Sequence, residues 1–128
     1  MPIESIRPGI KGRYEMTVDN MEAALKDGLA EAFGVPFLVM MMEKAAVNAL
    51  APFLAEGERS VGTYIDLMLT AAAPLERKVW AEARITEVKG KLITLEVLAF
   101  DEKGPIGRAT HGRALINPED FKVRMNAK

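Results

Sequence analysis

The sequence predicts an α+β domain in which one long helix packs against a five-stranded antiparallel sheet. Residues 34–54 show an almost continuous apolar helical pattern, and residues 60–116 alternate between apolar and polar positions with a period of two. Glycine-containing turns, Lys89-Gly90 and Asp101–Gly104, separate the last strands. A helix and a sheet that are each apolar on one face bury those faces most simply against each other.

The first part of the chain holds one strand and the long helix. Arg13–Val18 is rich in β-forming residues and predicts a short strand, and a weak helical turn follows at Met21–Lys26. The main helix opens at Gly34–Pro36, since proline suits a first helical position, and runs to about Leu50–Leu54. Gly57 is a natural stop.

The second part of the chain predicts four strands joined by short turns, which indicates an antiparallel meander. In the second of these strands apolar residues alternate with mostly charged ones, and in the third Ile93, Leu95, Val97 and Ala99 alternate inward, so one face of each is expected to enter the core. The four strands are expected at Ser60–Ala71, Lys78–Val88, Leu92–Phe100 and Pro105–Ile116.

Composition limits the possible functions. The chain has 128 residues, so we expect a single domain over 1–128. Its 17 basic and 18 acidic residues give a net charge of −1, without the basic surplus of a nucleic-acid-binding protein. With no cysteine and one histidine, neither a disulfide, a metal site nor a cofactor is expected.

The start of the chain and its longest apolar run bear on localisation. Met1–Arg13 is polar and mixed in charge, unlike a signal peptide. Val35–Met42 is far shorter than the roughly 20 residues that cross a bilayer. We therefore expect a cytoplasmic protein that has no membrane partner.

Glu43 is the most informative residue, because the helical period places it in the middle of an apolar face. An unpaired carboxylate buried there would be costly. Glu43 is therefore either a structural residue, paired with a basic or backbone group or lying at a subunit interface, or a base or water-orienting group that lines a pocket. Its apolar neighbours on this face are Pro36, Val39, Met40, Ala46, Val47 and Leu50.

Other candidates are open to two interpretations. The Gly62-Thr63 step offers a backbone amide and a hydroxyl to a ligand, although a β-forming threonine beside a strand glycine is common. His111 and Arg113 share one face of the last strand, where an exposed sheet face or an ion pair is expected more often than a site. Met40–Met42 is more typical of core packing than of an acyl pocket.

Several segments, in order, resemble the hotdog-fold thioesterase superfamily, in the branch that contains fluoroacetyl-CoA thioesterase. They extend from about Ile10 to Phe121, and their collinearity carries the resemblance. The segments are Val35–Ala46, Leu50–Gly57, Ser60–Thr63, Ala71–Pro74 and Ile106–Arg113.

The resemblance implies a hotdog fold, in which the sheet wraps around the central helix, and hydrolysis of a small or medium acyl-CoA thioester. It also implies a homodimer, or a tetramer, whose helices are surrounded by a shared sheet. The family's catalytic carboxylate corresponds to Glu43, its glycine near the thioester to Gly62, and the arginine of its Thr-His-x-Arg segment to Arg113. Two positions differ: the family's threonine before the helix proline is Val35, and its catalytic histidine is Leu69.

Three functions are compatible with these residues. The first is a thioesterase in which Glu43 activates water directly and a backbone amide polarises the carbonyl. The second is a non-catalytic protein that binds acyl-CoA or another small ligand, for which the apolar Val35 and Leu69 would line the entrance. The third is a dimeric protein without a small ligand, in which Glu43 is structural.

Overall fold

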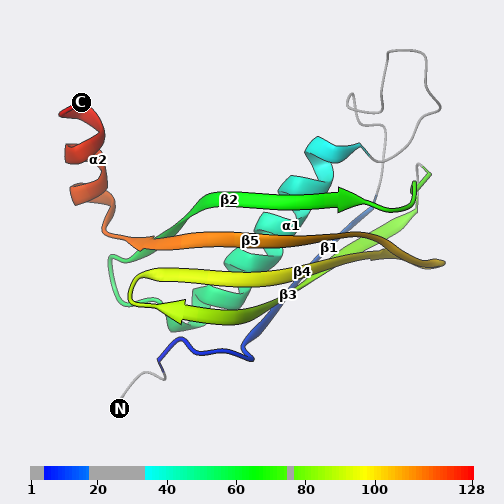
Figure 1. Ribbon diagram of the computed structural model, residues 1–128, viewed down its shortest axis with the longest axis horizontal. Helices are drawn as coiled ribbons and strands as arrows, with labels where there is room; N and C mark the ends of the chain where they lie inside the picture. The colour runs from blue at the N-terminus through cyan, green and yellow to red at the C-terminus, as the bar shows by residue number, and fades with distance from the viewer. Residues whose placement is uncertain (1–4, 18–33, 75–76) are drawn as a thin grey trace.

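The computed structural model describes residues 5–17, 34–74 and 77–128. The predicted helical turn at Met21–Lys26 lies outside these residues. One sheet and one long helix make up the body, and a short helix follows at the C-terminus (Figure 1). The elements are β1 (Lys11–Thr17), α1 (Val35–Leu50), η1 (Ala51–Phe53), β2 (Arg59–Leu69), β3 (Lys78–Lys89), β4 (Leu92–Asp101), β5 (Gly104–Ile116) and α2 (Pro118–Asn126).

The predicted fold class is confirmed, but the strand order corrects the four-stranded meander. The order is β1-β3-β4-β5-β2 and all neighbours are antiparallel, so only β3, β4 and β5 form a meander. Tight turns with glycines at positive φ, Gly90 at 61° and Gly104 at 143°, join these three strands. The strand β2 does not pair with β3, the next strand along the chain, and pairs instead with β5 at the edge of the sheet.

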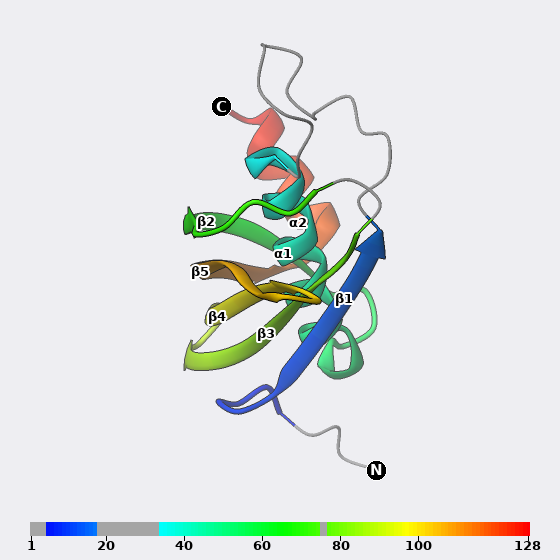
Figure 2. The same ribbon diagram turned by 90° about the vertical axis from the view of Figure 1, so that its right-hand side faces the viewer.

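The helix α1 lies in the concave face of the curved sheet (Figure 2). The alternation predicted for β3 and β4 is confirmed, because their inward residues are almost fully buried against the helix. Met41 and Met42 are core residues, whereas Met40 is 36% exposed. The helical side of the core consists of Leu38, Met41, Met42, Ala45, Ala46, Ala49 and Leu50.

The closest approach of helix and sheet is at Gly12 of β1. A Cβ atom added to Gly12 would lie 2.5 Å from the carbonyl oxygen of Ala45 and still closer to the backbone nitrogen of Ala49. The backbones of β1 and α1 therefore touch with no room for a side chain. Most contacts of α1 are with β1 and β3 and few are with β2 and β5, so the helix lies toward one side of the sheet.

The ends of α1 largely follow the sequence. Gly34 precedes the helix and Pro36 lies in its first turn, while Pro52 falls in the 3₁₀ turn η1 that ends it. By length and composition, one stretch of the described chain, Val35–Phe53, would suffice to cross a membrane. The same stretch supplies the helical side of the core, which accounts for its apolar character.

The helix α2 is an element that the sequence analysis missed. The Asn117 side chain accepts hydrogen bonds from the backbone N–H groups of Glu119 (2.9 Å) and Asp120 (3.2 Å), and Pro118 occupies the first turn. Asn-Pro-Glu-Asp is a recognisable helix start, so the signal was present. None of its residues is buried, because α2 projects from one end of the body (Figure 1).

Candidate active site

A cluster of polar side chains lies between α1 and the strands β5 and β2. Glu43 Oε2 on the helix is 3.6 Å from Nη1 of Arg113 on β5. The Arg113 side chain is only 6% exposed, whereas that of Glu43 is 42% exposed. The expected burial of Glu43 is thus wrong for a single chain, because α1 leans toward β1 and β3 and leaves this side of the helix open.

His111 and Arg113 both point inward from β5, which corrects the expected exposed sheet face. His111 is 1% and Arg113 6% exposed, and Arg113 makes the ion pair that was the alternative interpretation. Because residues two apart share one face of a strand, both side chains meet α1 in the concave face of the sheet.

A β-bulge in β2 brings Gly62 to the cluster. Gly62 pairs with Arg113 and Ile65 with His111, so three steps along β2 match two along β5, and Thr63 is the extra residue. The bulge changes the strand's alternation: Ile65 packs on the core, yet Gly62 faces the helix as well. A Cβ atom added to Gly62 would lie 2.6 Å from Glu43 Oε2.

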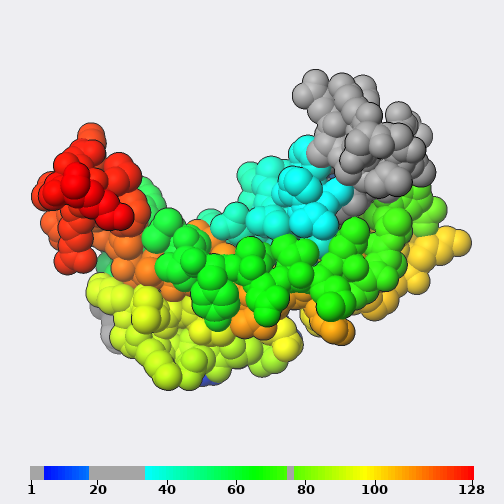
Figure 3. All heavy atoms as spheres, turned by 45° about the horizontal axis from the view of Figure 1, so that its top comes forward, coloured from blue at the N-terminus to red at the C-terminus, as the bar shows by residue number. Residues whose placement is uncertain are grey.

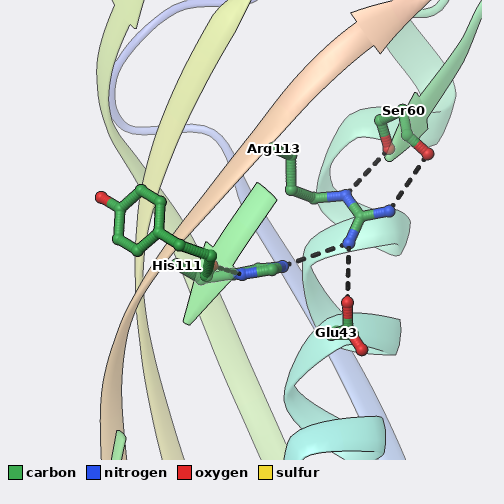
Figure 4. A network of polar contacts seen from close by, with 5 residues as sticks. Glu43, Ser60, His111 and Arg113 are labelled. Atoms are coloured by element: carbon green, nitrogen blue, oxygen red, sulfur yellow. Dashed lines mark hydrogen bonds and ion pairs between the residues drawn. The ribbon is translucent and has the colours of Figure 1, made fainter. Parts of the chain in front are cut away.

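Arg113 is held by both sides of this bulge (Figure 4). Its Nε donates to Ser60 Oγ at 2.9 Å and its Nη2 donates to the Ser60 carbonyl oxygen at 3.1 Å. Its Nη1 lies 3.1 Å from Nε2 of His111, whose Nδ1 is 2.8 Å from the Tyr64 carbonyl oxygen. The guanidinium is therefore fixed in orientation and presents Nη1 to the helix.

Burial and charge shift the protonation equilibria of this cluster. Burial lowers the pKa of His111, and the Arg113 charge lowers it further, while the hydrogen bond to Tyr64 and the charge of Glu43 act in the opposite direction. Burial also lowers the pKa of Arg113, and Glu43 opposes this shift. Arginine stays charged at any physiological pH, so the cluster holds a cation beside a partly hydrated carboxylate.

The other predicted site residues lie apart from this cluster. Thr63 Oγ1 and the Tyr64 ring lie over Gly112 on the outer face of the sheet, away from Glu43. Val35 (43% exposed) begins α1, and Leu69 (36% exposed) ends β2. These two ends are neighbours, because the Leu38 side chain lies against Gly107, which pairs with Leu69.

The sequence analysis did not identify Ser60 as the hydrogen-bond partner of Arg113. Ser60 and Gly62 have the same strand parity, so both face Arg113, but Ile65 has the opposite parity and also faces inward. The bulge is what allows residues of opposite parity to face the same side of the sheet. No residue pattern in Ser60–Leu69 marks where it occurs.

Two grooves lie on the outer face of the sheet. One of about 500 Å³ is lined by Lys11, Arg13, Arg84 and Leu98, and another of about 380 Å³ by Met68 and Arg108.

Within residues 5–17, 34–74 and 77–128, no group of three or more acidic, histidine or cysteine side chains could hold a metal ion. The carboxylate of Glu43 is thus the base that this cluster offers, with a fixed cation and an unhindered glycine beside it.

A single helix in the concave face of an antiparallel sheet, with a carboxylate facing the edge strand, defines a hotdog-fold protein of the thioesterase class. A hot-dog-like protein from Thermanaerovibrio acidaminovorans has the same fold, with a TM-score of 0.84 at 23% identity over 92% of this chain and 89% of that one. The chain belongs to the fluoroacetyl-CoA-specific thioesterase family, whose sequence profile matches residues 14–119.

Individual members of the family are similar over most of the chain. The fluoroacetyl-CoA thioesterase of Streptantibioticus cattleyicolor is 40% identical over 98 residues, which are 77% of this chain and 70% of that protein. A solved structure of the fluoroacetyl-CoA thioesterase FlK superposes with a TM-score of 0.87 at 32% identity, covering 98% of both chains. A variant of that enzyme solved with fluoroacetate and CoA gives 0.80 over 91% of this chain and 99% of that one.

Proposed function

We propose that this protein hydrolyses a small or medium acyl-CoA thioester and that Glu43 is its general base. The observation that carries the proposal is the Glu43 carboxylate, which is 42% exposed, lies 3.6 Å from a buried guanidinium and faces the backbone of Gly62. Membership of the fluoroacetyl-CoA-specific thioesterase family supports it, as does the CoA-bound structure of a relative.

The chemistry needs one base and one hydrogen-bond donor for the oxyanion. Glu43 removes a proton from a water molecule as the water oxygen attacks the thioester carbonyl, and a backbone amide stabilises the oxyanion. The C–S bond then breaks, CoA leaves as a thiolate and the proton held by Glu43 returns to sulfur through solvent. Because a thiolate is a good leaving group, this route requires no side chain at Val35 or Leu69 that can donate a proton.

The same two positions favour a second function. Val35 and Leu69 replace a threonine and a histidine with apolar side chains, and both are partly exposed. A protein that binds acyl-CoA without hydrolysing it would have this combination: an apolar entrance and a pocket that lacks the family's hydroxyl and imidazole groups.

We also propose that the site is completed by a second copy of the chain. Val35 and Glu43 are eight residues apart on α1, or about 12 Å along the helix. Within one chain, Val35 and Leu69 therefore lie at a distance from Glu43. Among the described strands, β2 lies at the edge of the sheet and pairs only with β5, so none of them covers its outer side. An antiparallel copy along β2 would place the Val35–Leu69 end of one subunit against Glu43 of the other.

The exposed apolar side chains of α1 and β2 support this arrangement, since such a surface is normally covered. The helix and the edge strand lie side by side on one open face of the molecule (Figure 3). This face includes Val35, Met40 and Val47 of α1 and Leu69 of β2, each between 36% and 43% exposed. Sedimentation at micromolar concentration should give a dimer, and a monomer would contradict the shared site.

The substitution Glu43→Gln tests the catalytic proposal, because it keeps the size of the side chain and removes the base. Thiol release from a panel of short and medium acyl-CoAs should fall at least about a hundredfold in kcat. The matched control is Glu102→Gln in the exposed β4–β5 turn, which should retain the wild-type rate. If no panel member is hydrolysed but CoA esters raise the melting temperature, the protein is a binding protein.

A further inference from the structure

His111 is the one histidine of the chain, and the mechanism above does not use it. It lies in the centre of the cluster, 1% exposed, between the β2 bulge and Arg113. The family's catalytic histidine position is Leu69, on another strand, so His111 is not a displaced copy of that group.

The partners of the two ring nitrogens determine which one carries the proton. Nδ1 lies 2.8 Å from the Tyr64 carbonyl oxygen, which can only accept, so Nδ1 is the N–H donor. Nε2 lies 3.1 Å from Nη1 of Arg113, which can only donate, so Nε2 is the acceptor. A second proton at Nε2 would direct an N–H at another N–H, and the contact would break.

The same contact affects the pair formed by Arg113 and Glu43. Nη1 is shared between His111 Nε2 at 3.1 Å and Glu43 Oε2 at 3.6 Å. Charge-assisted N–H···O bonds are usually about 2.7–2.9 Å long, so the guanidinium is held short of a full hydrogen bond to the carboxylate. A carboxylate closed onto arginine would be a weaker base and would have less room for water.

We propose that His111 is a positioning residue for the hydrolysis: as a neutral, Nδ1-protonated imidazole it links the β2 bulge to Arg113 and keeps the guanidinium from closing onto Glu43. This inference rests on the proposed function, because it concerns the availability of the Glu43 carboxylate. The charged groups that act on His111 are Arg113 of β5 and Glu43 of α1. The inward residues of the neighbouring strand β4, such as Leu95, are apolar.

The first test uses the wild-type protein and no substrate. Because His111 is the single histidine, ¹⁵N-histidine labelling gives one pair of ring-nitrogen signals. At pH 7 they should show Nε2 without a proton and Nδ1 with one, and the ring should titrate below the usual range of histidine. The opposite tautomer, or titration at or above the usual value, overturns the inference even if the protein hydrolyses thioesters.

The second test is His111→Phe, which keeps the ring and removes both nitrogens. We expect kcat to fall between about tenfold and about a hundredfold, as for small displacements of a catalytic group, while KM changes little. The acid limb of the kcat profile should lose the part that follows protonation of His111, because phenylalanine binds no proton. A residue that only fills space would lower the rate equally at every pH, and that result overturns the inference.

A matched control and a folding check accompany this variant. Thr110→Val lies on the same strand with an exposed side chain and should leave both the rate and the acid limb unchanged. If His111→Phe does not fold, the tautomer measured in the wild-type protein still decides. If the wild-type protein hydrolyses no thioester, the proposed function fails, and the ring-nitrogen signals separately show whether His111 holds Arg113.

Discussion

Two glycines face the central helix from opposite edges of the sheet, and they have different roles. Gly12 of β1 lies against helix backbone, namely the carbonyl oxygen of Ala45 and the nitrogen of Ala49. Gly62 of β2 lies against side chains only, and the closest of these is the end of Glu43 at Oε2. Backbone in a helix cannot move aside without moving the helix, whereas a partly exposed carboxylate can rotate away.

The difference shows how this fold separates stability from chemistry. On the β1 side, helix and sheet touch directly and exclude water, because residues such as Ala45 and Ala49 are small. On the β2 side, the helix makes fewer contacts with the sheet, and the polar side chains of Glu43, Arg113 and His111 lie between them. A site for hydrolysis needs this partial exposure of Glu43, since water and a thioester must reach the carboxylate.

Of the changes that test this comparison, Gly12→Ala should have the largest effect, a loss of unfolding free energy. The added methyl group must displace the α1 backbone, and overpacking of this kind costs about 3 kcal/mol of unfolding free energy. Urea denaturation followed by circular dichroism measures it. A midpoint equal to that of the wild type would mean that the helix and β1 do not touch as the structure describes.

Gly62→Ala makes the same chemical change and should have the opposite outcome. The atom closest to its methyl group is the flexible end of Glu43, at 2.6 Å, and Arg113 Nη1 and His111 Cε1 lie at an ordinary contact distance of 3.4 Å, so the unfolding free energy should change by less than about 0.5 kcal/mol. The displaced carboxylate should lower kcat about tenfold, which corresponds to about 1.4 kcal/mol. Full activity together with normal stability would show that Gly62 does not set the position of Glu43.

The smallest expected effect is the dependence of stability on pH through His111. Because its pKa is lowered in the folded protein, the unfolded chain binds a proton below about pH 6.5 that the folded chain does not. The free energy of unfolding should therefore fall as the pH falls from about 6.5 to the lowered value, by at most about 1.4 kcal/mol per pH unit. The difference between wild-type and His111→Phe curves isolates this contribution.

A flat difference between those two curves would show that His111 is no more difficult to protonate in the folded protein than in the unfolded chain. The comparison is needed because other groups also titrate in acid. The pKa of Glu15 is lowered by its hydrogen bond to Arg13, and the pKa of Glu58 by a bond from the Ala55 backbone, and neither residue changes in this variant.

Much of the fold could be predicted from the sequence because its signals are local. Period-two alternation identified the buried faces of β3 and β4, and the glycine turns identified the β3–β5 meander. The position of β2 beside β5 could not be read in this way, because strand pairing across residues 70–77 depends on which edge of the sheet remains free. The start of α2 could have been predicted from the helix-capping Asn117 and from Pro118, but the sequence analysis did not include it.

For the site, the sequence by itself determined the participants: one carboxylate on an apolar helix face, a glycine in β2 and a His-x-Arg pair of one strand parity. The tertiary structure alone decided how they meet. The bulge at Thr63 changes the alternation of β2 and places Gly62 against Glu43, and the offset of α1 toward β1 leaves the carboxylate hydrated. Both depend on packing between segments distant in the chain, which no local residue pattern records.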